Sequence, residues 1–166
     1  MTMALNHFQP KPSDKIGQDS KRLATAKVLN QVLADSFAIY TKTLNYHWNV
    51  EGGKFIGIHE LTDKQYHNLF EAIDEIGERI RALGFYTPGS MKAFLDLTTI
   101  VEADAGETNA QTMLEDLERD HMHIVSKLRE GVAIAEQNND STTADMLSER
   151  SEFHEEAAWM LRSLSK

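Results

Sequence analysis

The sequence contains no cysteine among its 166 residues and only three prolines. Without thiols it cannot form disulfides, cysteine-ligated zinc sites or cysteine nucleophiles. No stretch approaches the roughly 18 apolar residues that cross a bilayer, and the N-terminus lacks an apolar run of signal-peptide length. We therefore expect a soluble, cytoplasmic protein whose chemistry depends on nitrogen and oxygen side chains.

The charge is mostly acidic and unevenly distributed. The formal net charge is −9 at pH 7; residues 1–22 carry +2 and the remainder carries −11. An acidic body attracts cations and does not seek nucleic acid. Residues 1–19, which hold two prolines and mostly polar residues, are expected to form a flexible N-terminal arm, and residues 20–166 one domain.

Apolar residues recur every three or four positions in four long segments, as in amphipathic helices. We expect helices at about 20–50, 57–83, 107–137 and 143–164, and a short one at 91–97. Thr142 and Asp145 have capping-box spacing at the start of the last helix. The long connection from 84 to 106 can cross a bundle, so the predicted fold is all-α: a ferritin-like four-helix bundle with a short helix in the crossover between helices two and three.

The second long helix has a polar face that is separate from its apolar stripe. That face carries His59, Asp63, His67, Phe70, Asp74, Gly77 and Glu78. His59 and Asp63 are four residues apart, as are Asp74 and Glu78, so each pair could hold one side of a metal ion. The pairs cannot share a metal within one chain, because about 16 Å of helix rise separates Asp63 from Asp74.

A two-fold symmetric dimer offers a solution. The outer ligands, His59 and Glu78, and the inner ligands, Asp63 and Asp74, have the same midpoint, between residues 68 and 69. An antiparallel second copy would set His59 level with Glu78 of the partner subunit, and Asp63 level with Asp74 of the partner subunit. The dimer would then contain two equivalent sites roughly 22 Å apart. Gly77 costs about 1 kcal/mol in a helix interior, and a close partner backbone would give it a reason to be there.

His47 extends the proposed ligand set. It continues the inward stripe of the first helix, and it flanks the same turn as His59. The donor set is then two imidazoles and three carboxylates, which suits Fe(II), Zn(II) or Mn(II). An oxygen-rich site with open positions can hold iron and stabilise Fe(III) after oxidation.

Three motifs carry a family resemblance. They are Tyr46-His47-Trp48-Asn49-Val50, then Gly53-x-Phe55-x-x-x-His59-Glu60-x-x-Asp63, and finally Asp74-Glu75-x-x-Glu78-Arg79. These motifs resemble the Dps family of mini-ferritins, and the later Trp159-Met160-Leu161-Arg162-Ser163 is similar too. The resemblance covers about residues 20–164.

The resemblance implies an iron-storage and detoxification ferroxidase that assembles as a hollow homo-dodecamer. In such proteins Fe(II) is oxidised at the dimer interface, preferably by hydrogen peroxide, and Fe(III) is stored as a mineral, which protects DNA. Carried over, His47, His59 and Asp63 come from one subunit and Asp74 and Glu78 from the other. Iron is the only cofactor implied; no organic cofactor is.

The resemblance also implies roles outside the ligand set. Trp48 would trap a stray radical, and Asp140, Asp145 and Glu149 would line an acidic pore on a three-fold axis. Many members bind DNA through a lysine-rich N-terminal tail, and nucleoid association would follow. This tail departs from that pattern, with few lysines and two aspartates.

Three rival functions are weaker. An intramolecular di-iron oxidase needs two Glu-x-x-His motifs, and Glu118-x-x-His121 is the one found. A zinc hydrolase would need His-Glu-x-x-His, but Asp63 stands where the second histidine belongs. A DNA-compacting structural protein conflicts with the −11 body, because duplex affinity comes mostly from neutralising phosphates.

Several of these residues also have plain structural interpretations. Asp74 and Glu78 could form a solvated helix face paired with Arg81, and Asp140 and Asp145 could be helix-start acids favoured by the dipole. His67 is expected at the subunit interface. We expect His121 in the core, and His154 and His7 on the surface.

Overall fold

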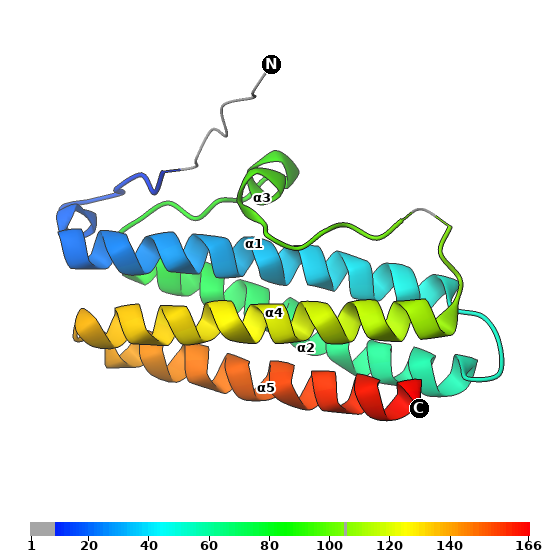
Figure 1. Ribbon diagram of the computed structural model, residues 1–166. Helices are drawn as coiled ribbons and strands as arrows, with labels where there is room; N and C mark the ends of the chain where they lie inside the picture. The colour runs from blue at the N-terminus through cyan, green and yellow to red at the C-terminus, as the bar shows by residue number, and fades with distance from the viewer. Residues whose placement is uncertain (1–8, 105) are drawn as a thin grey trace, which may run out of the picture.

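The computed structural model describes residues 9–104 and 106–166, and within these ranges it is a helical bundle without strands (Figure 1). The helices are α1 (Ser20–Asn49), α2 (Phe55–Ala82), α3 (Met91–Leu97), α4 (Ala110–Gln137) and α5 (Ser141–Ser165). A short 3-10 helix, η1 (Ile16–Gln18), precedes α1. The predicted all-α, four-helix fold with a short crossover helix is confirmed. None of the helices in the described ranges is long and apolar enough to span a membrane.

The four long helices form two antiparallel hairpins, α1 with α2 and α4 with α5 (Figure 1). Asn139 turns the second hairpin with a left-handed φ of 60°, a conformation that asparagine tolerates better than most residues. The next residue, Asp140, is the N-cap of α5 and accepts a hydrogen bond from the backbone N–H of Thr143 at 3.1 Å. The predicted Thr142–Asp145 capping box is therefore wrong, because the carboxylate of Asp140 already serves the first turn.

The crossover from α2 to α4 is held against α1 by a buried carboxylate. Asp35, in the middle of α1, is fully buried. It accepts hydrogen bonds from the backbone N–H of Thr99 at 2.6 Å and from the hydroxyl of Thr98 at 2.9 Å. Charge-assisted bonds of this kind are about twice as strong as neutral ones, so α3 and its flanks have a fixed place beside α1.

Part of the predicted N-terminal arm is bound to the bundle. The backbone N–H of Ser13 donates to the carbonyl of Gly84 at 2.8 Å, and that of Tyr86 donates to the carbonyl of Lys11 at 3.0 Å. Gly17 packs so closely on Gly84 that a side chain would collide with its carbonyl. Residues 11–17 thus contact the end of α2, whereas residues 1–8 of the arm, His7 included, lie outside the described residues.

A polar cluster interrupts the apolar core between α4 and α5. His121 is fully buried, which confirms its expected core position. His154 is only 1% exposed, so its predicted surface position is wrong. It lies on the inward stripe of α5 with Leu147, Arg150 and Leu161, and its Nδ1 lies 2.8 Å from Nδ1 of His121.

The two rings must share one proton between their Nδ1 atoms, so the ring that accepts the hydrogen bond is neutral. Burial lowers the pKa of His121 to about 3, with a smaller effect from the Arg150 charge. Burial also lowers the pKa of His154 well below its usual value, assisted by His121 and Arg150. Arg150 is itself buried and donates to Asn68 Oδ1 at 2.7 Å. The core therefore has no ready place for a protonated histidine.

Acid should destabilise the bundle through this pair. Above pH 6.5 both histidines are neutral in the folded and unfolded chains. As the pH falls below that value only the unfolded chain takes up protons, so the free energy of unfolding decreases by about 1.4 kcal/mol per histidine per pH unit. We expect urea unfolding near pH 5 to show a loss of roughly 2 kcal/mol for each histidine.

The control is a comparison of two variants. His121→Leu/His154→Leu should flatten the dependence on pH, and His123→Gln, at a partly exposed histidine, should not. Equal pH dependence in both variants would show that the buried pair is not the cause.

Candidate metal centre

His47 and His59 hold each other in place across the first hairpin. Nδ1 of His47 lies 3.0 Å from the backbone carbonyl of His59, and Nδ1 of His59 lies 3.0 Å from the backbone carbonyl of His47. The rings stack with centroids 3.8 Å apart and planes 17° apart. A carbonyl can only accept, so each Nδ1 carries the proton and each Nε2 keeps a free lone pair. That is the tautomer in which a histidine binds a metal through Nε2.

The local sequence explains this geometry. α1 ends at Asn49 and α2 begins at Phe55, so each histidine lies close to the same short connection. Thr62, fully buried one turn after Ile58, places its hydroxyl 3.2 Å from Nδ1 of His47. Phe55 stacks on the outer side of His59 with centroids 5.1 Å apart. The two imidazoles are therefore fixed by backbone and packing before any metal arrives.

Asp63 follows one helical turn after His59, on the same face of α2. Its side chain is 47% exposed, so it can reach a ligand from solvent. One oxygen, Oδ1, accepts a hydrogen bond from the hydroxyl of Tyr66 at 2.8 Å. The other oxygen, Oδ2, lies 3.7 Å from Nδ1 of His67, beyond hydrogen-bonding distance.

Asp74 and Glu78 lie further along α2 and are both exposed. They line an open groove of about 910 Å³, together with Phe70, Gly77 and Tyr86. Arg81 does not pair with either of them; it donates to the carbonyl of Phe85 at 2.8 Å and lies over the ring of Tyr86. In the described part of the chain neither carboxylate has an ion-pair partner, which leaves both able to bind a cation.

The five predicted ligands do not meet within one chain. The structure brings His47, His59 and Asp63 to one end of α2, and it leaves Asp74 about 16 Å and Glu78 about 22 Å of helix rise beyond Asp63. Over residues 9–104 and 106–166, no group of three or more histidine or carboxylate side chains forms a metal-binding cluster. In a single subunit the five predicted ligands therefore form two separate groups, the predicted half-sites.

The other predicted site residues have varied surroundings. Trp48 is 68% exposed beside the histidine pair, and His67 is exposed and donates from Nδ1 to the carbonyl of Asp63. Asp145 and Glu149 are exposed one turn apart on α5. Asp140 instead pairs with Arg79 at 2.6 Å and caps α5, so it has a structural partner that the pore interpretation did not include.

The rival di-iron interpretation loses its only motif. Glu118 pairs with Arg162 at 2.6 Å, and His121 is bonded to His154 inside the core. These two side chains therefore serve structural contacts. The sequence also gave no role to Thr62 and Tyr66, although Tyr66 follows Asp63 by three residues and so had to share its face of the helix.

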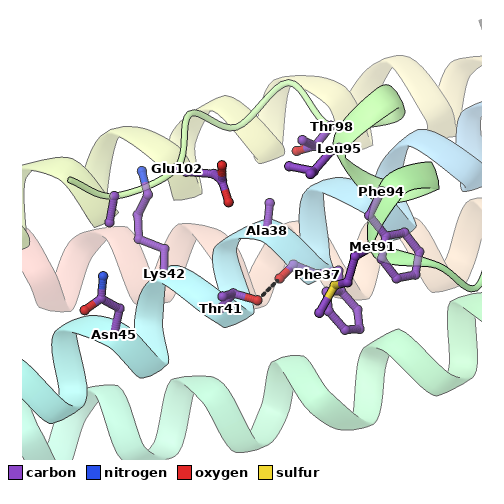
Figure 2. A pocket seen from close by; sticks show the side chains of 11 residues that line it. Phe37, Ala38, Thr41, Lys42, Asn45, Met91, Phe94, Leu95, Thr98 and Glu102 are labelled. Atoms are coloured by element: carbon purple, nitrogen blue, oxygen red, sulfur yellow. Dashed lines mark hydrogen bonds between the residues drawn. The ribbon is translucent and has the colours of Figure 1, made fainter. Parts of the chain in front are cut away.

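A second cavity lies away from the histidines, between α1 and α3 (Figure 2). It has a volume of about 360 Å³ and a mainly apolar lining that includes Phe37, Met91 and Leu95. At its polar end Lys42 is buried and pairs with Asp120 at 2.6 Å and Asp116 at 3.0 Å. This cavity has no free carboxylate pair and is not part of the candidate centre.

Comparison with known proteins gives consistent matches. The model of the ferritin-like domain matches residues 26–166. An uncharacterized low temperature-induced protein of Nostoc sp. is 42% identical over 146 residues, which cover 87% of this chain and 82% of that protein. The DNA protection during starvation protein 2 of Bacillus anthracis is 38% identical over 137 residues, covering 82% and 93%.

A solved structure extends the match to three dimensions. The crystal structure of a Dps protein from Vibrio cholerae O1 is described as a member of a broad superfamily of ferritin-like diiron-carboxylate proteins. It aligns with a TM-score of 0.84 at 26% identity, over 89% of this chain and 92% of that one. The likeness therefore extends over most of both chains.

The histidine tautomers give a direct test of the half-site. Solid-state NMR of protein labelled with ¹⁵N-histidine, at a pH above the usual histidine pKa, should show Nδ1 protonated and Nε2 unprotonated in both His47 and His59. Spectra of His47→Ala and His59→Ala would assign the signals. Protonation at Nε2 in either ring would contradict the reciprocal hydrogen bonds and leave that nitrogen unable to bind a metal.

Proposed function

The chain belongs to the Dps family of ferritin-like proteins, and on that premise we propose that it is a ferroxidase that stores iron and detoxifies peroxide. Fe(II) is the substrate, bound between His47, His59 and Asp63 of one subunit and the partner subunit's Asp74 and Glu78. The observation that carries this proposal is the locked histidine pair, with both Nε2 lone pairs free, one turn from a half-exposed carboxylate.

The chemistry of the two half-sites supports a shared centre. Imidazole nitrogens and carboxylate oxygens suit Fe(II), and several carboxylates stabilise Fe(III). Asp74 and Glu78 are exposed without an ion-pair partner in the described chain, inside an open groove. A Cβ at Gly77 would meet only a methyl of Thr87 at 3.6 Å, so packing within one chain does not require the glycine. Close approach of a second copy would require it.

We assign the oxidising role to hydrogen peroxide, which takes one electron from each of two Fe(II) ions and, with two protons, leaves as two waters. His47 and His59 anchor the first iron, and the carboxylates release Fe(III) once it is hydrolysed. Consuming peroxide and Fe(II) together prevents hydroxyl-radical formation and so protects DNA. Trp48, exposed beside the site, is proposed to take up a stray radical.

We propose that the dimer is the unit of a hollow dodecamer in which the mineral collects. The fold supports this, since the ferritin-like bundle recurs in the solved Dps structure. Asp145 and Glu149, exposed near the start of α5, are the better candidates for an acidic pore, because Asp140 is already paired with Arg79.

Stopped-flow absorbance of Fe(II) oxidation by hydrogen peroxide tests the activity. We expect fast oxidation by the native protein and a loss of at least about 10- to 100-fold in Asp74→Ala/Glu78→Ala, because residues that merely support a ligand already have effects of that size and here two of the five proposed ligands are missing. Glu152→Ala/Glu156→Ala removes two exposed carboxylates that are also four residues apart, but on α5 and outside this groove, and is the matched control for charge. Native protein that oxidises iron no faster than buffer would refute the ferroxidase proposal.

Mixed subunits test whether the site is shared. One variant carries His59→Ala/Asp63→Ala and the other carries Asp74→Ala/Glu78→Ala, so each homodimer lacks every complete site. A dimer of one subunit of each kind contains one intact site, so random co-assembly should restore about one quarter of native activity. If verified mixed assemblies recover no activity, the two groups of ligands do not form one shared site.

DNA binding is expected to be weak and sensitive to salt. The body carries −11, and Lys11 and Lys15 are the exposed lysines in the described part of the arm. Phosphate contacts of so few cations are lost as salt rises. A gel-shift assay should show retardation of DNA only at low salt. Tight binding at moderate salt would contradict this prediction and favour the DNA-compacting function.

A further inference from the structure

Tyr66 is not one of the predicted ligands, but it contacts two of them, Asp63 and His47, as well as the neighbouring His67. Its hydroxyl donates to Oδ1 of Asp63 at 2.8 Å. The edge of its ring packs against His47, with centroids 5.2 Å apart and planes 73° apart. Its face stacks on His67 with centroids 4.3 Å apart. One aromatic side chain therefore joins both kinds of ligand on this side of the centre.

The hydrogen bond from Tyr66 makes the two carboxylate oxygens of Asp63 different from each other. Oδ1 accepts a hydrogen bond from the phenol, whereas Oδ2 accepts none from the described residues. Oδ2 lies 3.7 Å from His67 Nδ1, which already donates to the backbone carbonyl of Asp63 at 2.8 Å. Oδ2 is thus the oxygen left for a cation. A half-exposed aspartate without such a bond would rotate about its terminal torsion, where the energy wells are broad.

We propose that Tyr66 is a positioning residue of the metal centre, which holds the carboxylate of Asp63 so that Oδ2 faces the iron bound by His47 and His59. This inference rests on the proposed ferroxidase function. Residues that orient a ligand without touching the metal commonly change metal affinity or activity by about 10- to 100-fold.

A neighbouring tyrosine supplies the matched control. Tyr40, on α1, meets Tyr66 edge to face with centroids 6.5 Å apart. Over residues 9–104 and 106–166 its hydroxyl has no hydrogen bond to another side chain or to the backbone. Tyr66→Phe and Tyr40→Phe thus remove the same atom at adjacent rings, but only the first removes a bond to Asp63. Both keep the ring, so the packing against His47 survives.

The experiment uses assembled protein and Co(II), added without oxygen or peroxide so that it is not oxidised, because its visible spectrum reports its ligands. Relative to native protein, Tyr66→Phe should bind Co(II) about tenfold more weakly and show an altered ligand-field spectrum at saturation. In Fe(II) oxidation, its half-saturating Fe(II) concentration should rise more than its maximal rate falls. Tyr40→Phe should match native protein in all three measurements, and both variants should melt at the native temperature.

A double-variant cycle tests whether Tyr66 acts through Asp63. If it does, Asp63→Ala/Tyr66→Phe binds Co(II) no more weakly than Asp63→Ala alone. Additive losses would overturn the positioning role, as would a Tyr66→Phe protein that equals Tyr40→Phe in affinity and spectrum.

The two levels of proposal fail in different ways. Native protein that binds no Co(II), or that binds it unchanged in Asp74→Ala/Glu78→Ala, refutes the shared centre and the role of Tyr66 with it. Native protein that binds Co(II) at the shared centre, together with an unaffected Tyr66→Phe, refutes only the role of Tyr66.

Discussion

The exchange of hydrogen bonds between His47 and His59 is the constraint on which the candidate centre depends. Each imidazole uses its Nδ1 proton on the backbone of the other residue, at 3.0 Å in both directions. The same bonds tie the last turn of α1 to the first turns of α2. The geometry of the hairpin and the orientation of the Nε2 atoms proposed to bind iron therefore depend on the same two hydrogen bonds.

The second proposed half-site, Asp74 and Glu78, differs from the histidine pair because nothing in the described chain fixes its side chains. Asp74 and Glu78 are exposed along a groove, and their side chains have no ion pair within the described residues. Carboxylates in this state can change position as a bound cation gains charge or hydrolyses. A centre made from one rigid half and one adaptable half fits a cargo that must be captured, oxidised and released.

The sequence was sufficient where helical periodicity decides the structure. The helices, the short crossover helix at Met91–Leu97 and the buried His121 follow from spacing alone. The sequence was not sufficient where a side chain's position depends on a partner from another helix. His154 was misplaced because a histidine on an inward stripe is stable only with a partner, and His121 supplies it from another helix. The role of Asp140 as cap depends on its own geometry and on Arg79 of α2, and a local capping motif cannot show either.

The hydrogen bonds of Asp35 have a consequence for the order of folding. The two hairpins are local in sequence, whereas the contacts of Asp35 with Thr98 and Thr99 join positions 63 and 64 residues apart. Closing a loop of that length costs chain entropy before the contact gives anything back, so the hairpins are expected to form before the crossover settles on α1. The buried aspartate thus acts late, on a chain that is already largely helical. Its hydrogen bonds select one path for the crossover among those that a segment of this length could take.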